Sequence, residues 1–320
     1  MSAAQQLLGM GYRLVCRQRL AILIYHQVLD QPDPIRPDVP DRAEFQWQME
    51  LIKRRFTPLG LAEAVQRLRQ GTLPPGAVCV TFDDGYRDNL EVALPVLQQT
   101  GVPATVFVST AFCQGENMWN DRVIDLVDQM PFETTDFGLV DCGSLALETI
   151  EQKRQACGTL LGKLKYQQPE QRLQKIEALY RHFGLAEAAP KMMSDNQVIE
   201  LAEAGIEIGA HTVDHPILKV LSPEQQFQQM ADSKAYLEQL IGRPVTGFAY
   251  PNGKPGVDYD QVTIDQLSRI GFDYAVSTAW GSNGPNQSHY ELKRFTPWEK
   301  TPQGFQRRLC WNGLQSMLGR

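Results

Sequence analysis

The chain has 320 residues, of which 42% are hydrophobic and 21% charged, and its formal net charge is -6. This length accommodates one large α/β domain or two ordinary ones, and the composition is typical of a globular protein. No apolar run approaches the roughly 20 residues that cross a bilayer, and no block of Lys and Arg offers a phosphate site, which argues against an integral membrane protein and a nucleic-acid partner.

The first 19 residues predict an N-terminal helical segment. They lack the small-residue cleavage site of a signal peptide, and their apolar residues lie beside Arg13, Arg17 and Arg19. We expect this segment to pack on the domain, and the alternative is peripheral contact with an anionic membrane. Six cysteines without a CxxC pair favour a reducing compartment, so we expect a cytoplasmic protein, membrane-peripheral in the alternative.

Short apolar runs followed by helical patterns predict an α/β fold with a parallel sheet or barrel. Helices are indicated by capping boxes at Ser194 with Gln197 and at Ser222 with Gln225. The expected strands are residues 20–26, 77–82, 104–108, 206–210, 247–250 and 274–278.

Residues 113–193 predict a mainly helical insertion, because their apolar residues recur at helical spacing. We expect it to pack beside the barrel as a cap within one domain spanning residues 1–320. The proline-rich stretch 30–41 is typical of a loop.

Candidate catalytic residues follow two of the expected strands. Asp83 and Asp84 come directly after residues 77–82, and His211 and His215 come directly after residues 206–210. The carboxyl ends of parallel strands meet at one rim, where active sites are built. One carboxylate and two imidazoles make a catalytic metal site, and the remaining aspartate can act as general base. Alone, each pattern is usually a turn or a polar pair, but together they favour the metal site.

Three stretches resemble the NodB-like polysaccharide deacetylases, carbohydrate esterase family four. They are "VTFDDGYRDN" at 80–89, "GAHTVDH" at 209–215 and "FAYPNG" at 248–253. The resemblance implies a distorted (β/α) barrel with about seven strands. It also implies removal of an N-acetyl group from an amino sugar by a divalent metal, zinc first, with cobalt or nickel as alternatives.

Carried over by position, the resemblance assigns Asp83 as the catalytic base and Asp84, His211 and His215 as the metal ligands. The remaining matched positions have roles around the acetyl group. The backbone N–H of Tyr86 would contact the oxyanion, and the groove wall would comprise Tyr250 and Pro251.

The chain departs from the family pattern at two positions. Ala249 stands where many members have an arginine that orients the base, and Arg294 stands where many have a histidine that acts as general acid. Arginine does not readily give up a proton, but Arg294 could orient Asp83 or hold a substrate anion. His26, at the end of the first strand, is the candidate acid; the alternative is a hydrogen-bonded barrel histidine.

The sequence thus predicts a metal-dependent hydrolase acting on an N-acetylated sugar in a glycan, glycolipid or sugar precursor. From the insertion, we expect Trp119, Asn120 and Asp121 to close the site. Two alternatives remain open, an amidohydrolase of a small non-sugar amide and a non-catalytic sugar-binding homologue. The oligomeric state is not predicted.

Overall fold

The computed structural model describes residues 18–315. Most of the predicted N-terminal segment 1–19, with the membrane contact assigned to it, therefore lies outside the described residues. Contacts divide the chain into two compact units. Unit 1 is formed by the described parts of Met1–Gln31, Pro40–Gln114 and Met192–Arg320, and unit 2 by Pro32–Val39 and Gly115–Lys191.

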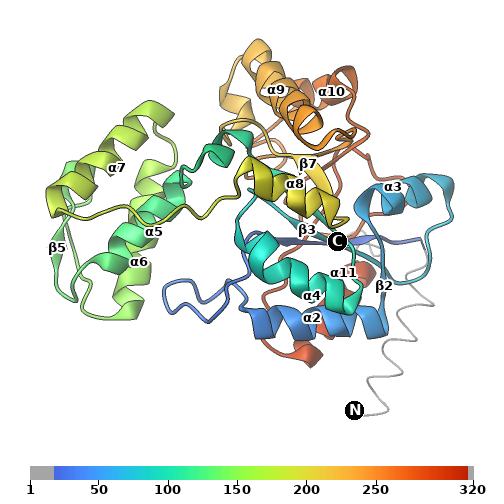
Figure 1. The fold of residues 1–320 in the computed structure, drawn as a ribbon, viewed down its shortest axis with the longest axis horizontal. Helices are drawn as coiled ribbons and strands as arrows, with labels where there is room; N and C mark the ends of the chain where they lie inside the picture. The colour runs from blue at the N-terminus through green and yellow to red at the C-terminus, as the bar shows by residue number, and fades with distance from the viewer. Residues whose placement is uncertain (1–17, 316–320) are drawn as a thin grey trace. The chain divides into compact units, whose positions relative to one another are not determined.

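Unit 1 is built on a seven-stranded parallel sheet (Figure 1). Its order is β1-β3-β4-β7-β8-β9, and β2 pairs with β3. The prediction of a distorted (β/α) barrel with about seven strands is confirmed. The strands are β1 (Ala21–Tyr25), β2 (Thr57–Pro58), β3 (Ala77–Phe82), β4 (Ala104–Val108), β7 (Glu207–Ala210), β8 (Gly247–Ala249) and β9 (Tyr274–Val276).

The longer strands are almost entirely apolar, with Thr81 and Thr105 as the polar exceptions in β3 and β4, because both of their faces are covered. Every residue of β1, β3 and β4 is buried. Continuous apolar runs of this kind are typical of parallel strands between a barrel interior and its outer helices. β3 and β4 begin and end where the sequence predicted.

A short segment between the first and last strands completes the ring. Leu292 forms a parallel bridge with Val276 of β9, and Phe295 forms one with Leu23 of β1. Backbone hydrogen bonds continue on both sides, including one of 3.1 Å from the Phe295 N–H to the Ile22 carbonyl. The residue before Phe295 is Arg294, whose side chain is fully buried.

Helices of unit 1 cover the sheet and begin at identifiable caps. Asp41 caps α2, and capping boxes at Ser194 and Ser222 begin α8 and α9, as predicted. α2 and α4 pack side by side, as do α9 and α10 (Figure 1). The α-helices are α2 (Arg42–Arg55), α3 (Leu61–Gln70), α4 (Leu94–Thr100), α8 (Asp195–Glu203), α9 (Pro223–Ile241), α10 (Gln261–Ile270) and α11 (Pro302–Gln315).

Unit 2 has its own apolar core. It contains α5 (Trp119–Gln129), α6 (Ile150–Leu164) and α7 (Pro169–Phe183), with a short antiparallel pair formed by β5 (Thr135–Asp136) and β6 (Ser144–Leu145). Leu126, Leu160 and Ile176 are at most 1% exposed and lie in one hydrophobic cluster. Residues 32–39, expected as a plain loop, belong to this unit.

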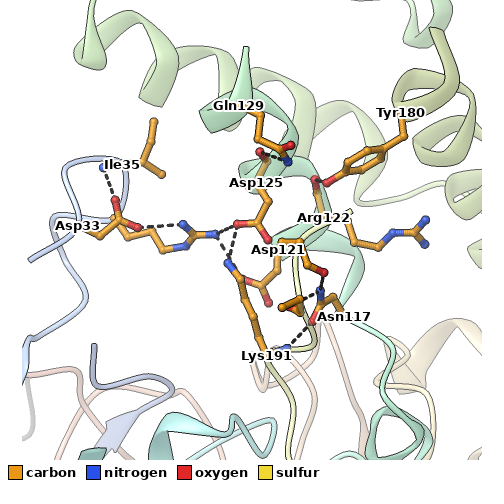
Figure 2. Close-up of polar contacts among 12 residues, drawn as sticks. Asp33, Ile35, Asn117, Asp121, Arg122, Asp125, Gln129, Tyr180 and Lys191 are labelled. Carbon is orange, nitrogen blue, oxygen red and sulfur yellow. Dashed lines mark hydrogen bonds and ion pairs between the residues drawn. The ribbon is translucent and has the colours of Figure 1, made fainter. Parts of the chain in front are cut away.

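A buried ion cluster joins segment 32–39 to α5 (Figure 2). Arg36 pairs with Asp33 at 2.9 Å and with Asp125, whose carboxylate also pairs with Lys191. Asp121 lies 3.9 Å from the Arg36 guanidinium. The Arg36 and Asp125 side chains are 9% and 8% exposed. Buried charges of this kind are stable only when they are paired, so the cluster fixes three segments of unit 2 together.

Asn117 joins the two ends of the insertion. Its side-chain oxygen accepts a 2.6 Å hydrogen bond from the Lys191 backbone, and its Nδ2 donates to the carbonyls of Ala188 and Ala189 at 3.2 Å (Figure 2). The point where the chain enters unit 2 is thereby fastened to the point where it leaves.

Within residues 18–315, no helix is both long and apolar enough to span a bilayer. None of the five cysteines in that range forms a disulfide. The cytoplasmic, membrane-peripheral location stays a prediction.

We predict that Arg36→Met weakens unit 2, because it leaves the buried Asp125 carboxylate short of a partner. The free energy of opening α5, measured by native-state hydrogen exchange, should fall by about 2 kcal/mol. Lys175→Met is the matched control, since its 3.6 Å pair with Asp141 is exposed and should matter by less than about 1 kcal/mol. Equal effects of the two changes would contradict the buried cluster's role.

Candidate active site and metal centre

The carboxyl end of β3 presents two acidic side chains on a tight turn. The Asp83 N–H still donates to the Tyr25 carbonyl at 3.0 Å, as in the sheet. Asp84 and Gly85 then take φ angles of 77° and 91°. A Cβ on Gly85 would lie 3.1 Å from the Val108 side chain, so this turn against β4 favours glycine. Adjacent aspartates are thereby turned to different surroundings.

The two histidines lie on a second tight turn, after β7. Thr212 and His215 have φ angles of 66° and 54°, which is uncommon for residues with a side chain. The Thr212 hydroxyl accepts a 3.1 Å hydrogen bond from the His215 N–H. Ser109 donates to the His211 carbonyl at 2.9 Å. Such backbone conformations persist only where neighbouring contacts enforce them, and they are concentrated at functional sites.

Asp84, His211 and His215 converge as a possible ligand set, with one ligand atom from each lying within 4.8 Å of the others. Nε2 of each histidine is 3.4 Å from Asp84 Oδ1. That oxygen is buried and has no hydrogen-bond partner among the described residues. His211 Nδ1 lies 2.7 Å from the Ala249 carbonyl, which leaves Nε2 facing the cluster. A carboxylate and two imidazoles around an unpartnered buried oxygen fit a divalent metal such as zinc.

The cluster also shifts the pKa values of its members. Burial would raise the pKa of Asp84, but the close approach of the His211 ring and the charges of His215 and His26 lower it well below its usual value. Burial lowers the pKa of His215 to about 4. At neutral pH, Asp84 is therefore ionised and His215 is neutral, the protonation states that metal ligands need. Burial would lower the pKa of His211, but the adjacent Asp84 and Asp83 carboxylates raise it above its ordinary value.

Arg294 reaches across the barrel to Asp83. Its Nη1 and Nη2 donate to the two carboxylate oxygens at 2.7 Å each. Its Nη1 also donates to Thr81 Oγ1 at 3.2 Å, and its Nε donates to the Ser277 carbonyl at 3.0 Å. The backbone N–H of Arg294 donates to the Ala279 carbonyl. Such a bidentate pair fixes the plane of the carboxylate. The two hydrogen bonds therefore orient Asp83. Because the Arg294 side chain is fully buried, a substrate anion cannot reach it.

Arg294 also keeps Asp83 ionised. Burial by itself raises the pKa of this carboxyl, but the charges of Arg294 and His211 outweigh burial, and the pKa lies below its ordinary value. Each carboxylate oxygen retains a second lone pair beside its bond to the arginine. The geometry is that of an oriented carboxylate able to accept a proton.

His26 follows β1, and its side chain is exposed. No hydrogen bond joins its ring to another described side chain; its backbone carbonyl accepts from Asn89 at 2.8 Å. Burial and nearer charged groups have the larger effects on the pKa values of Asp83 and Asp84, and the charge of His26 also lowers both. An exposed ring without such a hydrogen bond differs from the alternative of a hydrogen-bonded barrel histidine, and the role of His26 as the acid stays a prediction.

The expected groove-wall residues are buried. Tyr250 is 1% exposed, stacks on Tyr259 with ring centroids 3.7 Å apart and donates to the Tyr290 carbonyl. Pro251 is buried beside it. The Tyr86 side chain is 3% exposed, and the oxyanion role expected for its backbone N–H stays a prediction.

The residues expected to close the site from the insertion lie at the start of α5, in unit 2. Trp119 lies under the Arg172 guanidinium at 4.4 Å, and Asp121 is 2% exposed in the ion cluster around Arg36. Asn120 is partly exposed. Their role in closing the site stays a prediction.

Asp214, between the two histidines, points away from the cluster. Its Oδ2 accepts a 2.8 Å hydrogen bond from Gln229 of α9, whose Oε1 accepts from the N–H groups of Val213 and Asp214. This aspartate shapes the loop. Thr81 and Ser277 hold Arg294 through hydrogen bonds. The sequence did not predict this role, because nothing in the local pattern around either residue indicates it.

A family model described as "Polysaccharide deacetylase" matches residues 70–138 and 163–275, together more than half of the chain. The chain belongs to the polysaccharide deacetylase family. It is therefore a hydrolase of the N-acetyl amide bonds of carbohydrates. This deacetylase is also 25% identical over 277 residues to YxkH of Bacillus subtilis (strain 168), whose name assigns it to the polysaccharide deacetylases. The match covers 86% of this chain and 70% of YxkH.

Solved structures share the fold of this deacetylase. The deacetylase PplD of Streptococcus pyogenes, in complex with acetate, is 20% identical with a TM-score of 0.61, covering 91% of this chain and 98% of PplD. IcaB from Ammonifex degensii is 20% identical with a TM-score of 0.57, and the match covers 92% of this chain and 97% of IcaB. At these identities, the likeness concerns the fold alone.

We predict that Arg294→Lys lowers kcat about tenfold, because lysine keeps the charge but cannot bind both oxygens of Asp83. Losing one charge-assisted hydrogen bond raises the pKa of Asp83, so the acid limb of the pH profile should move to higher pH. Steady-state rates of acetate release between pH 4 and pH 9 measure both effects. An unchanged kcat and acid limb would contradict the orienting role.

We predict that Asp84→Asn abolishes stoichiometric metal binding, whereas Asp214→Asn, in the loop between the histidines, retains it. The amide removes the only carboxylate of the ligand set, while Asp214 bonds Gln229. Metal content after dialysis, measured by mass spectrometry, is the readout. Equal loss of metal in both variants would argue against the assigned ligands.

Proposed function

We propose that Asp84, His211 and His215 hold a divalent metal, zinc first, and that Asp83 is the base of a sugar N-deacetylation. The observation that carries the proposal is the pair of adjacent aspartates with separate partners. Asp83 is held by Arg294, and Asp84 faces two imidazoles with an unpartnered oxygen. One carboxylate is thus oriented for proton transfer while its neighbour is available as a ligand.

The proposed substrate is an N-acetylated amino sugar within a polymer. PplD and IcaB share this fold, and the family acts on polysaccharides. When bound, the metal would supply a positive charge that polarises the amide carbonyl. The residues supply the remaining chemistry.

Asp83 accepts a proton from the water that attacks the amide carbon. The Tyr86 backbone N–H donates to the oxygen on which negative charge develops. As the bond between carbon and nitrogen breaks, acetate leaves and the amine must take up a proton. His26 donates that proton, since both guanidinium nitrogens of Arg294 that face the site are bonded to Asp83 and arginine does not readily give up a proton.

Acetate release from N-acetylhexosamine oligomers, with zinc or cobalt added, tests the reaction. We expect release by the intact protein and a loss of at least about 100-fold in Asp83→Asn, which keeps the side-chain shape but cannot accept the proton. Metal content should remain near one equivalent in both proteins. If the metal-bound protein released acetate from none of the oligomers, the proposal would be wrong. That result would favour a sugar-binding homologue if the oligomers bind, and an amidohydrolase if only small amides react.

His26→Gln tests the proton donor. We expect kcat to fall about 100-fold with metal content unchanged, because glutamine keeps the polarity but does not supply a proton at neutral pH. With an N-acetyl anilide, whose amine is a better leaving group, kcat should fall less in His26→Gln, because that amine needs less protonation as it leaves. His182→Gln in α7 of unit 2 is the control and should retain wild-type turnover. Normal turnover in His26→Gln would exclude the role.

A further inference from the structure

Two exposed tryptophans lie on the loops that leave the closing segment of the barrel and β9. Trp280 is 41% exposed and Trp298 is 56% exposed. Their rings stack with centroids 5.9 Å apart and an interplanar angle of 29°. Most large apolar side chains of unit 1 are buried, so a pair of indoles in contact with solvent needs an explanation.

The pair is connected directly to the residue that orients Asp83. Trp280 follows Ala279, whose carbonyl accepts a 3.0 Å hydrogen bond from the Arg294 N–H. Trp298 comes four residues after Arg294. Both indoles are therefore tethered within a few residues of the candidate site, on the rim where the strands end.

The surroundings of Trp280 make it a support for Trp298. The Trp280 ring packs on Phe295 at 5.5 Å, and the Arg308 guanidinium lies 5.7 Å from its centroid. Arg308 is in turn paired with Glu299. With Trp280 held between Phe295 and Arg308, Trp298 keeps the more exposed ring, and the charged Glu299 follows it in the sequence.

We propose that Trp298, supported by Trp280, is a stacking platform for a sugar ring of an N-acetylhexosamine polymer, next to the sugar that is deacetylated. This inference rests on the proposed function and extends it from the reacting sugar to its neighbour. The apolar face of a pyranose ring packs on an exposed indole, while its hydroxyls remain available to polar groups at the edge. A second sugar on the platform makes the preferred substrate an oligomer.

The test compares Trp298→Ala with Trp311→Ala, a change of an equally large indole that is 51% exposed on α11. For an N-acetylhexosamine tetramer, we expect Trp298→Ala to raise KM about tenfold with kcat within twofold, because the platform acts in binding alone. Trp298→Phe should restore most of the affinity, and Trp311→Ala should match the intact protein. An unchanged KM in Trp298→Ala, or an equal rise in Trp311→Ala, would overturn the inference.

Stopped-flow indole fluorescence separates the platform from the chemistry. The tetramer should quench fluorescence of the intact, metal-loaded protein before the first turnover, and the quenching should be lost in Trp298→Ala. If the tetramer quenches this signal but releases no acetate, the proposed function fails and the platform stands. If acetate is released and the signal is the same in Trp298→Ala, the platform fails and the proposed function stands.

Discussion

The bidentate ion pair between Arg294 and Asp83 is the interaction on which the site depends. It buries a full positive and a full negative charge inside the barrel, and each is stable there only because of the other. The pair holds the carboxylate in one plane, keeps it ionised and leaves the neighbouring Asp84 to face the histidines. Removing the arginine would therefore change the protonation, the orientation and the stability of the same group together.

Uncommon backbone conformations lie in the same loops as the candidate catalytic residues. Asp84, Thr212, His215 and Asn252 all have positive φ angles, and each belongs to one of the three motif stretches. Short turns of this kind allow consecutive residues to point in different directions, so that Asp83 and Asp84 meet different partners. The strands that precede these turns are buried apart from Glu207 at the start of β7, and they keep the sheet fixed while the loops hold their uncommon backbone conformations.

The sequence was sufficient for the parts of the fold that follow from local pattern. Residues 77–82 and 104–108 are continuous apolar runs, and the capping boxes at Ser194 and Ser222 begin helices through local hydrogen bonds. The closing segment at Leu292 to Phe295 escaped prediction because only two of its residues pair with strands and it carries charged side chains. β5 and β6 are two residues long, too short for any periodicity to appear.

The site shows the same division between local and distant information. Asp83, Asp84, His211 and His215 could be found because their types and spacing occur directly after strands. The partner of Asp83 could be offered only as one of two roles for Arg294, since 211 positions separate the two residues and the choice depends on how the ring closes. The sequence did not predict a role for Trp298, because the role of a tryptophan in a polar loop depends on the residues packed beside it.

The position of Arg294 along the chain has a consequence for how the protein is made. A ribosome releases the aspartates, the histidines and most of the sheet well before residues 292–295 emerge, and nascent chains fold from the N-terminal side first. Until that late segment docks between β9 and β1, Asp83 lies in an open barrel without its counter-charge. The order of synthesis therefore makes the orientation of this carboxylate one of the last events in folding, so that a partly made chain has the candidate ligands but not the oriented carboxylate beside them.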